Sequence, residues 1–287
     1  SSNSNNSTTS GNSGDSDLTN TFSISESNGN WTIRSNSIPL HSLTGTSYAT
    51  PVSAQDFFFS ITAIPSLANG TTNLSDDFPR AFGVTLDGVK LDPLTAECYD
   101  TAGDKIQGGN QCPFRQDALQ TFSKLGLDTE FGHVQPTGAY HYHSYSTVAA
   151  NAIYKKYTGS EPTSVTDLVL VGIARDGFPI YFSLKGTVSP SYKIKDAQNI
   201  TRTSFVSKNG GGEPGLYIQD YVFDSAGDLD ECNGKPSALP TTDYSAYPDN
   251  GGFSLSASIN YYYVITSAFP GIPHCFKGTI NSGSDGF

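Results

Sequence analysis

The chain has 287 residues and a net charge of −11, and only 15% of its residues are charged. An acidic chain lacks the Lys and Arg clusters that displace counterions from phosphate, which argues against nucleic-acid binding. No apolar run approaches the length of about 18 residues that a membrane-spanning helix needs. Because the chain starts at Ser1 and contains no methionine, we expect that a signal peptide has been removed and that the protein is secreted.

Residues 1–20 form a low-complexity leader of Ser, Asn, Thr, Gly and Asp. Such a segment has too little apolar surface to offset the entropy lost when it becomes ordered. It becomes ordered only where another surface holds it, and a neighbouring copy of the chain is one such surface. The leader therefore suggests self-association, by donation of a strand to another subunit.

From residue 21 onward, short β-rich runs alternate with Gly, Asn, Asp and Pro, which predicts a mainly β fold. It is either all-β or α+β with a few short helices. Helical spacing of apolar residues predicts helices at 116–125 and 147–157. The predicted strands lie at 21–26, 30–35, 56–64, 82–91, 167–174, 178–184, 215–223 and 259–269.

An internal repeat is the main organising feature of residues 21–287. A hairpin signature at Asp87-Gly88 recurs at Asp176-Gly177, and a Leu-Asp pair at 127–128 recurs at 229–230. Each pair is followed by a tyrosine-rich strand, at 140–143 in the first half and at 261–264 in the second. We expect two diverged copies of one unit, at about 50–150 and 160–280, packed as a single globular unit.

Four cysteines favour two local disulfides, Cys98 with Cys112 and Cys232 with Cys275, because short loops cost less entropy to close. The other two pairings stay open at this point. Acceptor tripeptides for N-linked glycans occur in polar, turn-like surroundings at Asn69, Asn73 and Asn199, and a further one occurs at Asn30.

Three of the five histidines fall within eleven positions: His133, His141 and His143. On a strand, residues i and i+2 project to the same face, so His141 and His143 can offer two imidazoles to one metal ion. The turn around Pro136 and Gly138 can bring His133 back as a third ligand. Three neutral imidazoles suit copper or zinc, although buried histidines that only hydrogen-bond to their neighbours are an equal alternative.

The chain resembles the YHYH-domain proteins, which are named for the tetrapeptide at 140–143. The resemblance rests on the segments at 88–97, 132–143, 172–181, 229–234 and 269–278. It implies a secreted protein, YHYH-type over residues 21–287, in which the histidines are a natural metal site. Members of that family commonly carry a second Tyr-His-Tyr-His strand, where this chain has 261–264 without histidine, and Lys235 stands where histidine is frequent.

The sequence contains no G-x-S-x-G, H-E-x-x-H or P-loop motif, so no catalytic residue is assigned and an enzyme is the less favoured class. The favoured function is an extracellular structural or binding protein, such as the self-assembling subunit of a surface filament, which would be a homopolymer. The alternative is a soluble copper- or zinc-binding protein, or a metal-dependent enzyme, that uses His133, His141 and His143.

Overall fold

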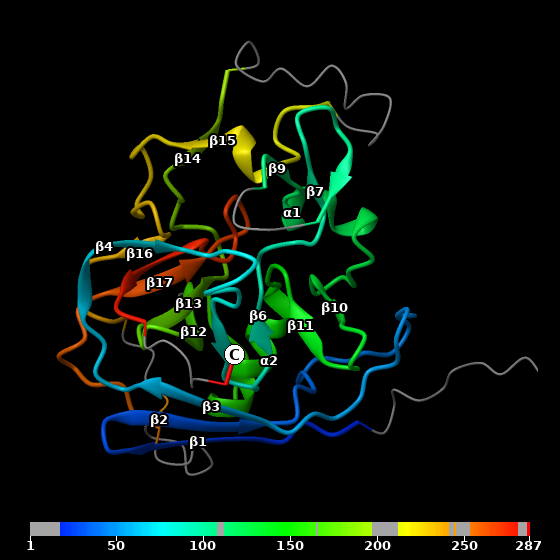
Figure 1. Cartoon of the computed structure of the whole chain (residues 1–287). Coiled ribbons are helices and arrows are strands. Elements are labelled where there is room, and N and C mark those ends of the chain that lie inside the picture. The colour runs from blue at the N-terminus through cyan, green and yellow to red at the C-terminus, as the bar shows by residue number, and fades with distance from the viewer. Residues whose placement is uncertain are drawn as a thin grey trace, which may run out of the picture.

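A computed structural model describes residues 18–107, 112–164, 166–196, 212–240, 244, 253–280 and 286–287. In this part of the chain, an eight-stranded sheet runs through the centre of the molecule (Figure 1). Most of the buried apolar side chains belong to one cluster around this sheet. In spatial order its strands are β10 (Gly132–Val134), β11 (Tyr140–Tyr142), β6 (Lys90–Leu91), β5 (Gly83–Thr85), β12 (Leu168–Ala174), β13 (Pro179–Ser183), β17 (Tyr262–Ile265) and β16 (Gly234–Lys235).

Smaller sheets surround the central one, and the fold is therefore mainly β, as the sequence predicts. Figure 1 shows a three-stranded sheet at the bottom of the molecule, made of β1 (Phe22–Ser27), β2 (Asn30–Ser35) and β3 (Phe57–Thr62). At the top lie the pair β14 (Tyr192–Ile194) and β15 (Tyr221–Phe223), and β7 (Cys98–Tyr99) between β8 (Lys105–Ile106) and β9 (Phe114–Arg115). A last pair joins β4 (Leu67–Asn73) to β18 (Cys275–Gly278).

Two short α-helices complete the described fold, and both overlap helices that the sequence predicts. The first, α1 (Ala118–Thr121), continues into the 3-10 turn η2 (Phe122–Lys124). The second, α2 (Thr147–Thr158), packs on β12 through an apolar face that includes Ile153 and Tyr157. Ser146 caps its N-terminus, and Gly159 ends it with φ +68°, a conformation that glycine adopts without strain.

Two segments differ from the sequence prediction. Residues 215–223 are not one strand, because the 3-10 turn η4 (Ile218–Asp220) precedes the short strand β15. The Asp220 carboxylate accepts hydrogen bonds from the backbone N–H groups of Gly215 and Tyr217, which bends this segment away from an extended path. The sequence does not predict strand β4, because this segment is mostly polar. In the structure all residues of β4 are exposed.

The sequence of parallel and antiparallel pairings in the central sheet is the same when it is followed from either edge to the middle. The antiparallel pair β5–β12 lies in the middle, and each of these strands forms a hairpin with β6 or β13. Those strands pair in parallel with β11 and β17, which pair antiparallel with β10 and β16. This arrangement is the one that a duplicated unit would give, and the duplication itself remains our proposal.

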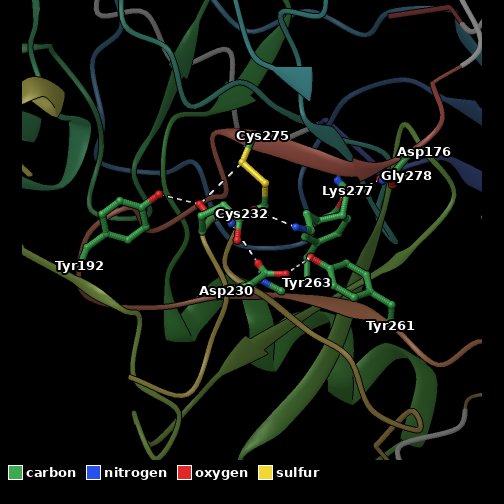
Figure 2. The surroundings of a disulfide bond; sticks show 11 residues. Asp176, Tyr192, Asp230, Cys232, Tyr261, Tyr263, Cys275, Lys277 and Gly278 are labelled. Carbon is green, nitrogen blue, oxygen red and sulfur yellow. Dashed lines mark hydrogen bonds and ion pairs between the residues drawn. A yellow bond between two sulfur atoms is a disulfide. The ribbon is translucent and has the colours of Figure 1, made fainter. Parts of the chain in front are cut away.

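An aspartate organises the loop before the outer strand pair in each half; Asp128 is buried and Asp230 is half-buried. In the second half, Asp230 Oδ1 accepts hydrogen bonds from the backbone N–H groups of Cys232 and Gly234, and Tyr261 donates its hydroxyl to Asp230 Oδ2 at 2.9 Å (Figure 2). A Cβ atom on Gly234 would lie 1.7 Å from the Tyr261 hydroxyl oxygen, so only glycine fits there. We call this arrangement the Asp230 clamp.

The first half contains the matching Asp128 clamp. Asp128 Oδ1 accepts hydrogen bonds from the N–H groups of Glu130 and Gly132, both at 2.9 Å. Tyr140 donates its hydroxyl to Asp128 Oδ2 at 2.7 Å, and Tyr48 donates to the same oxygen at 2.6 Å. The Tyr48 contact has no counterpart among the hydrogen bonds of the Asp230 clamp.

Two disulfides link the pairs that the sequence favours. Cys98 is joined to Cys112, and Cys232 to Cys275. The second disulfide ties the Asp230 clamp to β18, beside the ion pair of Lys277 with Glu231 at 2.7 Å. No helix in the described ranges has the length and apolarity needed to cross a membrane.

The difference between the two clamps gives a first prediction. Replacement Tyr261→Phe leaves Asp230 Oδ2 without a donor among the described residues, so we expect a loss of about 1–3 kcal/mol in the free energy of unfolding. Tyr140→Phe should cost less, because Tyr48 still donates to Asp128 Oδ2. Urea denaturation measures both, with Tyr154→Phe on α2 as the control. Equal losses, or the reverse order, would contradict this account of the clamps.

Candidate metal centre

The three clustered histidines lie on neighbouring strands at one edge of the central sheet. His133 on β10 is directly opposite His141 on β11, and His143 follows two residues later on the same side as His141. The turn between the strands is closed by a hydrogen bond from the Gly138 N–H to the Gln135 carbonyl. The structure thus brings together all three residues that the sequence singles out.

The ring nitrogens of these histidines converge. His143 Nε2 lies 3.1 Å from His141 Nε2 and 3.1 Å from His133 Nε2. Three nitrogens bound tetrahedrally to one zinc ion at about 2.0–2.1 Å would lie about 3.3 Å apart. Two of the three nitrogen–nitrogen distances are therefore close to those of a three-histidine metal site, and the three candidate ligand atoms all lie within 4.8 Å of one another.

The hydrogen bond of His133 fixes which nitrogen faces the cluster. Its Nδ1 lies 3.3 Å from the backbone carbonyl oxygen of Leu125, which only accepts hydrogen bonds. Nδ1 therefore carries the proton of the neutral ring, and Nε2 keeps its lone pair toward the other two histidines. Histidines that ligate metals are commonly oriented in this way by a carbonyl or carboxylate behind the ring.

Burial keeps these rings neutral. It lowers the pKa of His141 to about 3, with a further contribution from His133. Burial and the neighbouring rings lower the pKa of His143 well below its usual range, and burial lowers the pKa of His133. Neutral imidazoles are the form that binds metal ions, so the cluster is ready for a cation at neutral pH.

The Asp128 clamp positions His133. It fixes the loop that enters β10, and the Phe131 carbonyl in that loop accepts a hydrogen bond from the His143 N–H at 2.9 Å. Neither of the nearby carboxylates, Asp128 and Glu130, forms a hydrogen bond to a histidine ring. Asp128 holds the loop, Glu130 accepts from the Ser146 hydroxyl, and the partner of His133 is Leu125.

The described residues offer three candidate ligands at this centre. In the described part of the chain, no cysteine sulfur or carboxylate oxygen joins the three histidines in the group. Zinc sites with three protein ligands usually keep a fourth position for water or substrate, whereas structural sites are closed by four. The donor set therefore fits zinc or copper with one open position.

The second half lacks this chemistry at the matching places. Lys235 is opposite Tyr262 there, as His133 is opposite His141, and Val264 donates its N–H to the Asn233 carbonyl as His143 does to Phe131. The family resemblance also places Lys235 at a position where histidine is frequent in YHYH-domain proteins. One metal ion per chain is the expected occupancy.

Of the expected glycan acceptors, Asn69 and Asn73 lie on the exposed strand β4 rather than in turns, and Asn30 is half-buried on β2. Asn199 is outside the described residues. Glycosylation at these four asparagines remains a prediction.

Sequence reasoning missed two contributors to the centre, Tyr48 in the Asp128 clamp and Asp92 beside His143. Both come from segments distant in sequence from the histidines. Asp92 lies in one of the segments that carry the family resemblance, at 88–97. That resemblance was the sequence signal that could have pointed to Asp92.

The model of the YHYH protein family matches residues 58–278, which include the histidine cluster, both disulfides and, apart from Tyr48, both clamps. The chain belongs to the YHYH family. No curated protein and no solved structure matches it. The Tyr-His-Tyr-His strand of this YHYH protein is the one that carries Tyr140 of the clamp and two of the three candidate ligands.

Metal content tests the cluster directly. Replacing His133 or His143 by Gln removes one of three ligands, so we expect the bound zinc or copper to fall from about one ion per chain to near zero. His274→Gln is the control, because His274 lies outside the cluster. Elemental analysis by mass spectrometry after dialysis gives the ratio. Unchanged metal content in both cluster variants would remove the metal assignment.

The lowered pKa values predict how metal retention depends on pH. As pH falls, protons compete with the metal for imidazole nitrogens, and a lowered pKa moves that competition to lower pH. We expect retention of most of the metal at about pH 6, where an ordinary imidazole is more than half protonated. Metal content after dialysis at a series of pH values measures this. Loss of half the metal near pH 6.5 would contradict it.

Proposed function

We propose that this YHYH protein is a secreted metal-binding protein that holds one zinc or copper ion at His133, His141 and His143. The observation that carries the proposal is the convergence of three neutral Nε2 atoms, with 3.1 Å between His143 and each of the other two. Both disulfides support an oxidising, extracellular location. The metal content of the two cluster variants is the deciding experiment.

A binding role is favoured over catalysis. An enzyme would need a nucleophile, or a general acid together with a general base, at the open metal position, and also a site that holds a substrate there. The histidine rings themselves are neutral and serve as ligands, and the Asp128 carboxylate is occupied by the clamp. The metal therefore presents a site to which another molecule can bind.

A second candidate function is self-assembly, as the subunit of an extracellular filament. Strand β1 supports it, because β1 is an edge of its three-stranded sheet and most of its residues are exposed. An exposed edge is able to accept a strand from another chain. Residues 1–17 of the expected leader lie outside the described residues. Leu18 to Asn20 lie within them, and Asn20 donates hydrogen bonds to the carbonyls of Ile38 and Asp87.

Truncation tests the assembly candidate. Because Asn20 is bonded to the domain, the deletion should stop at residue 17. We expect the shortened chain to keep its fold, since the family match begins at residue 58. It should lose assembly, because the segment proposed to donate a strand is missing. Light scattering with size-exclusion chromatography measures the mass, and circular dichroism serves as the control for folding. A truncated chain that assembles like the full-length protein would rule out strand donation by the leader.

A further inference from the structure

An ion pair between a half-exposed arginine, Arg80, and a buried aspartate, Asp92, lies beside the histidine cluster. Asp92 directly follows β6, and its N–H donates to the Tyr142 carbonyl at 2.8 Å. This bond continues the parallel pairing of β6 with β11, in which Lys90 is beside His141 and Leu91 beside Tyr142. Asp92 is therefore the neighbour of His143, and side chains next to each other on paired strands project from the same face.

The Asp92 carboxylate has one satisfied and one unsatisfied oxygen. Oδ2 accepts a hydrogen bond from Arg80 Nε at 3.2 Å. Oδ1 is buried and has no hydrogen-bond partner among the described residues, although Asp92 is only 4% exposed. Leaving a buried charged acceptor unpaired is costly, so a donor is expected next to this oxygen.

The side chains near Asp92 do not supply that donor. Arg80 engages the other oxygen, and Lys90 directs its ammonium over the rings of Phe57 and Phe59, at 4.5 and 5.5 Å from their centroids. The positive charges of Arg80 and Lys90 also act on His141, and that of Arg80 acts on His143, which agrees with the ion pair lying close to the cluster.

We propose that Asp92 Oδ1 accepts a hydrogen bond from a protic ligand, water or a hydroxyl compound, at the fourth coordination position of the metal held by the three histidines. This inference rests on the proposed metal-binding function. Arg80 fixes the orientation of Asp92 through Oδ2, which leaves Oδ1 without a described partner on the face that Asp92 shares with His143. A carboxylate there favours ligands that carry a proton over simple anions, because an anion has no hydrogen to donate and is repelled by the negative charge.

Titration with azide, a simple anion that competes with the protic ligand for the open coordination position, measures this preference at constant pH. The copper(II)-loaded full-length chain is titrated with azide at pH 7, and the azide-to-copper charge-transfer band gives the dissociation constant. Asp92→Asn removes the negative charge, so azide should bind about tenfold more tightly than to the wild-type chain. Arg80→Gln removes the positive charge, so azide should bind more weakly, by about threefold or more.

Two matched controls separate this effect from general changes in burial or charge. Asp176 is a fully buried carboxylate in the second half, and burial raises its pKa to about 6, as it does that of Asp92. Arg34 is an arginine on β2 that lies over the Phe58 ring. Asp176→Asn and Arg34→Gln should leave the azide dissociation constant within about twofold of the wild-type value.

The outcomes distinguish failure of this inference from failure of the proposed function. If copper binds and Asp92→Asn leaves azide affinity unchanged, the role of Asp92 is wrong while the metal site stands. If the wild-type chain binds no copper, both are wrong. If Asp92→Asn does not fold, Arg80→Gln decides, because the Arg80 side chain is 48% exposed and the backbone hydrogen bond of Asp92 to Tyr142 does not depend on it. Unchanged azide affinity in Arg80→Gln would then overturn the inference.

Discussion

The hydrogen bonds of the Asp128 carboxylate determine where the ligands of the candidate metal centre lie. Asp128 fixes the loop that leads into β10, and its contact with Tyr140 joins that loop to β11, the strand that carries His141. A buried carboxylate that accepts several hydrogen bonds is rigid, because each bond compensates for lost hydration and none can be released cheaply. The imidazoles are attached to this fixed loop and strand, which keeps their Nε2 atoms close to one another.

The two halves of the sheet use the same clamp for different purposes. In the first half, it supports a cluster of neutral histidines at the sheet edge. In the second, Cys232 within the clamp is joined covalently to β18 through Cys275, and the ligand positions hold Lys235, Tyr262 and Val264. The clamp of the second half thus contains a covalent link, whereas the clamp of the first half lies beside the candidate metal ligands.

Local sequence patterns predicted what depends on local sequence. Alternation and turn residues gave the hairpins at Asp87-Gly88 and Asp176-Gly177, and the i, i+2 spacing gave the shared face of His141 and His143. The features that the sequence did not predict depend on contacts between residues far apart in the chain. The polar strand β4 exists because β18 pairs with it. Phe276 on β18 is opposite Thr72 on β4, although the two residues are 204 positions apart in the chain. The place of Asp92 beside His143 follows from parallel pairing of β6 with β11, and no turn or periodicity encodes that.

Strand β10 is the outermost strand of the central sheet, and it carries only one of the three histidines. An edge strand of three residues has few hydrogen bonds to hold it, so it is among the first elements to detach in local fluctuations. An ion shared between His133 and the two histidines near β11 would bridge this edge to its neighbour. Metal occupancy would then slow amide hydrogen exchange at residues 132–134 while leaving the opposite edge, β16, exchanging as before.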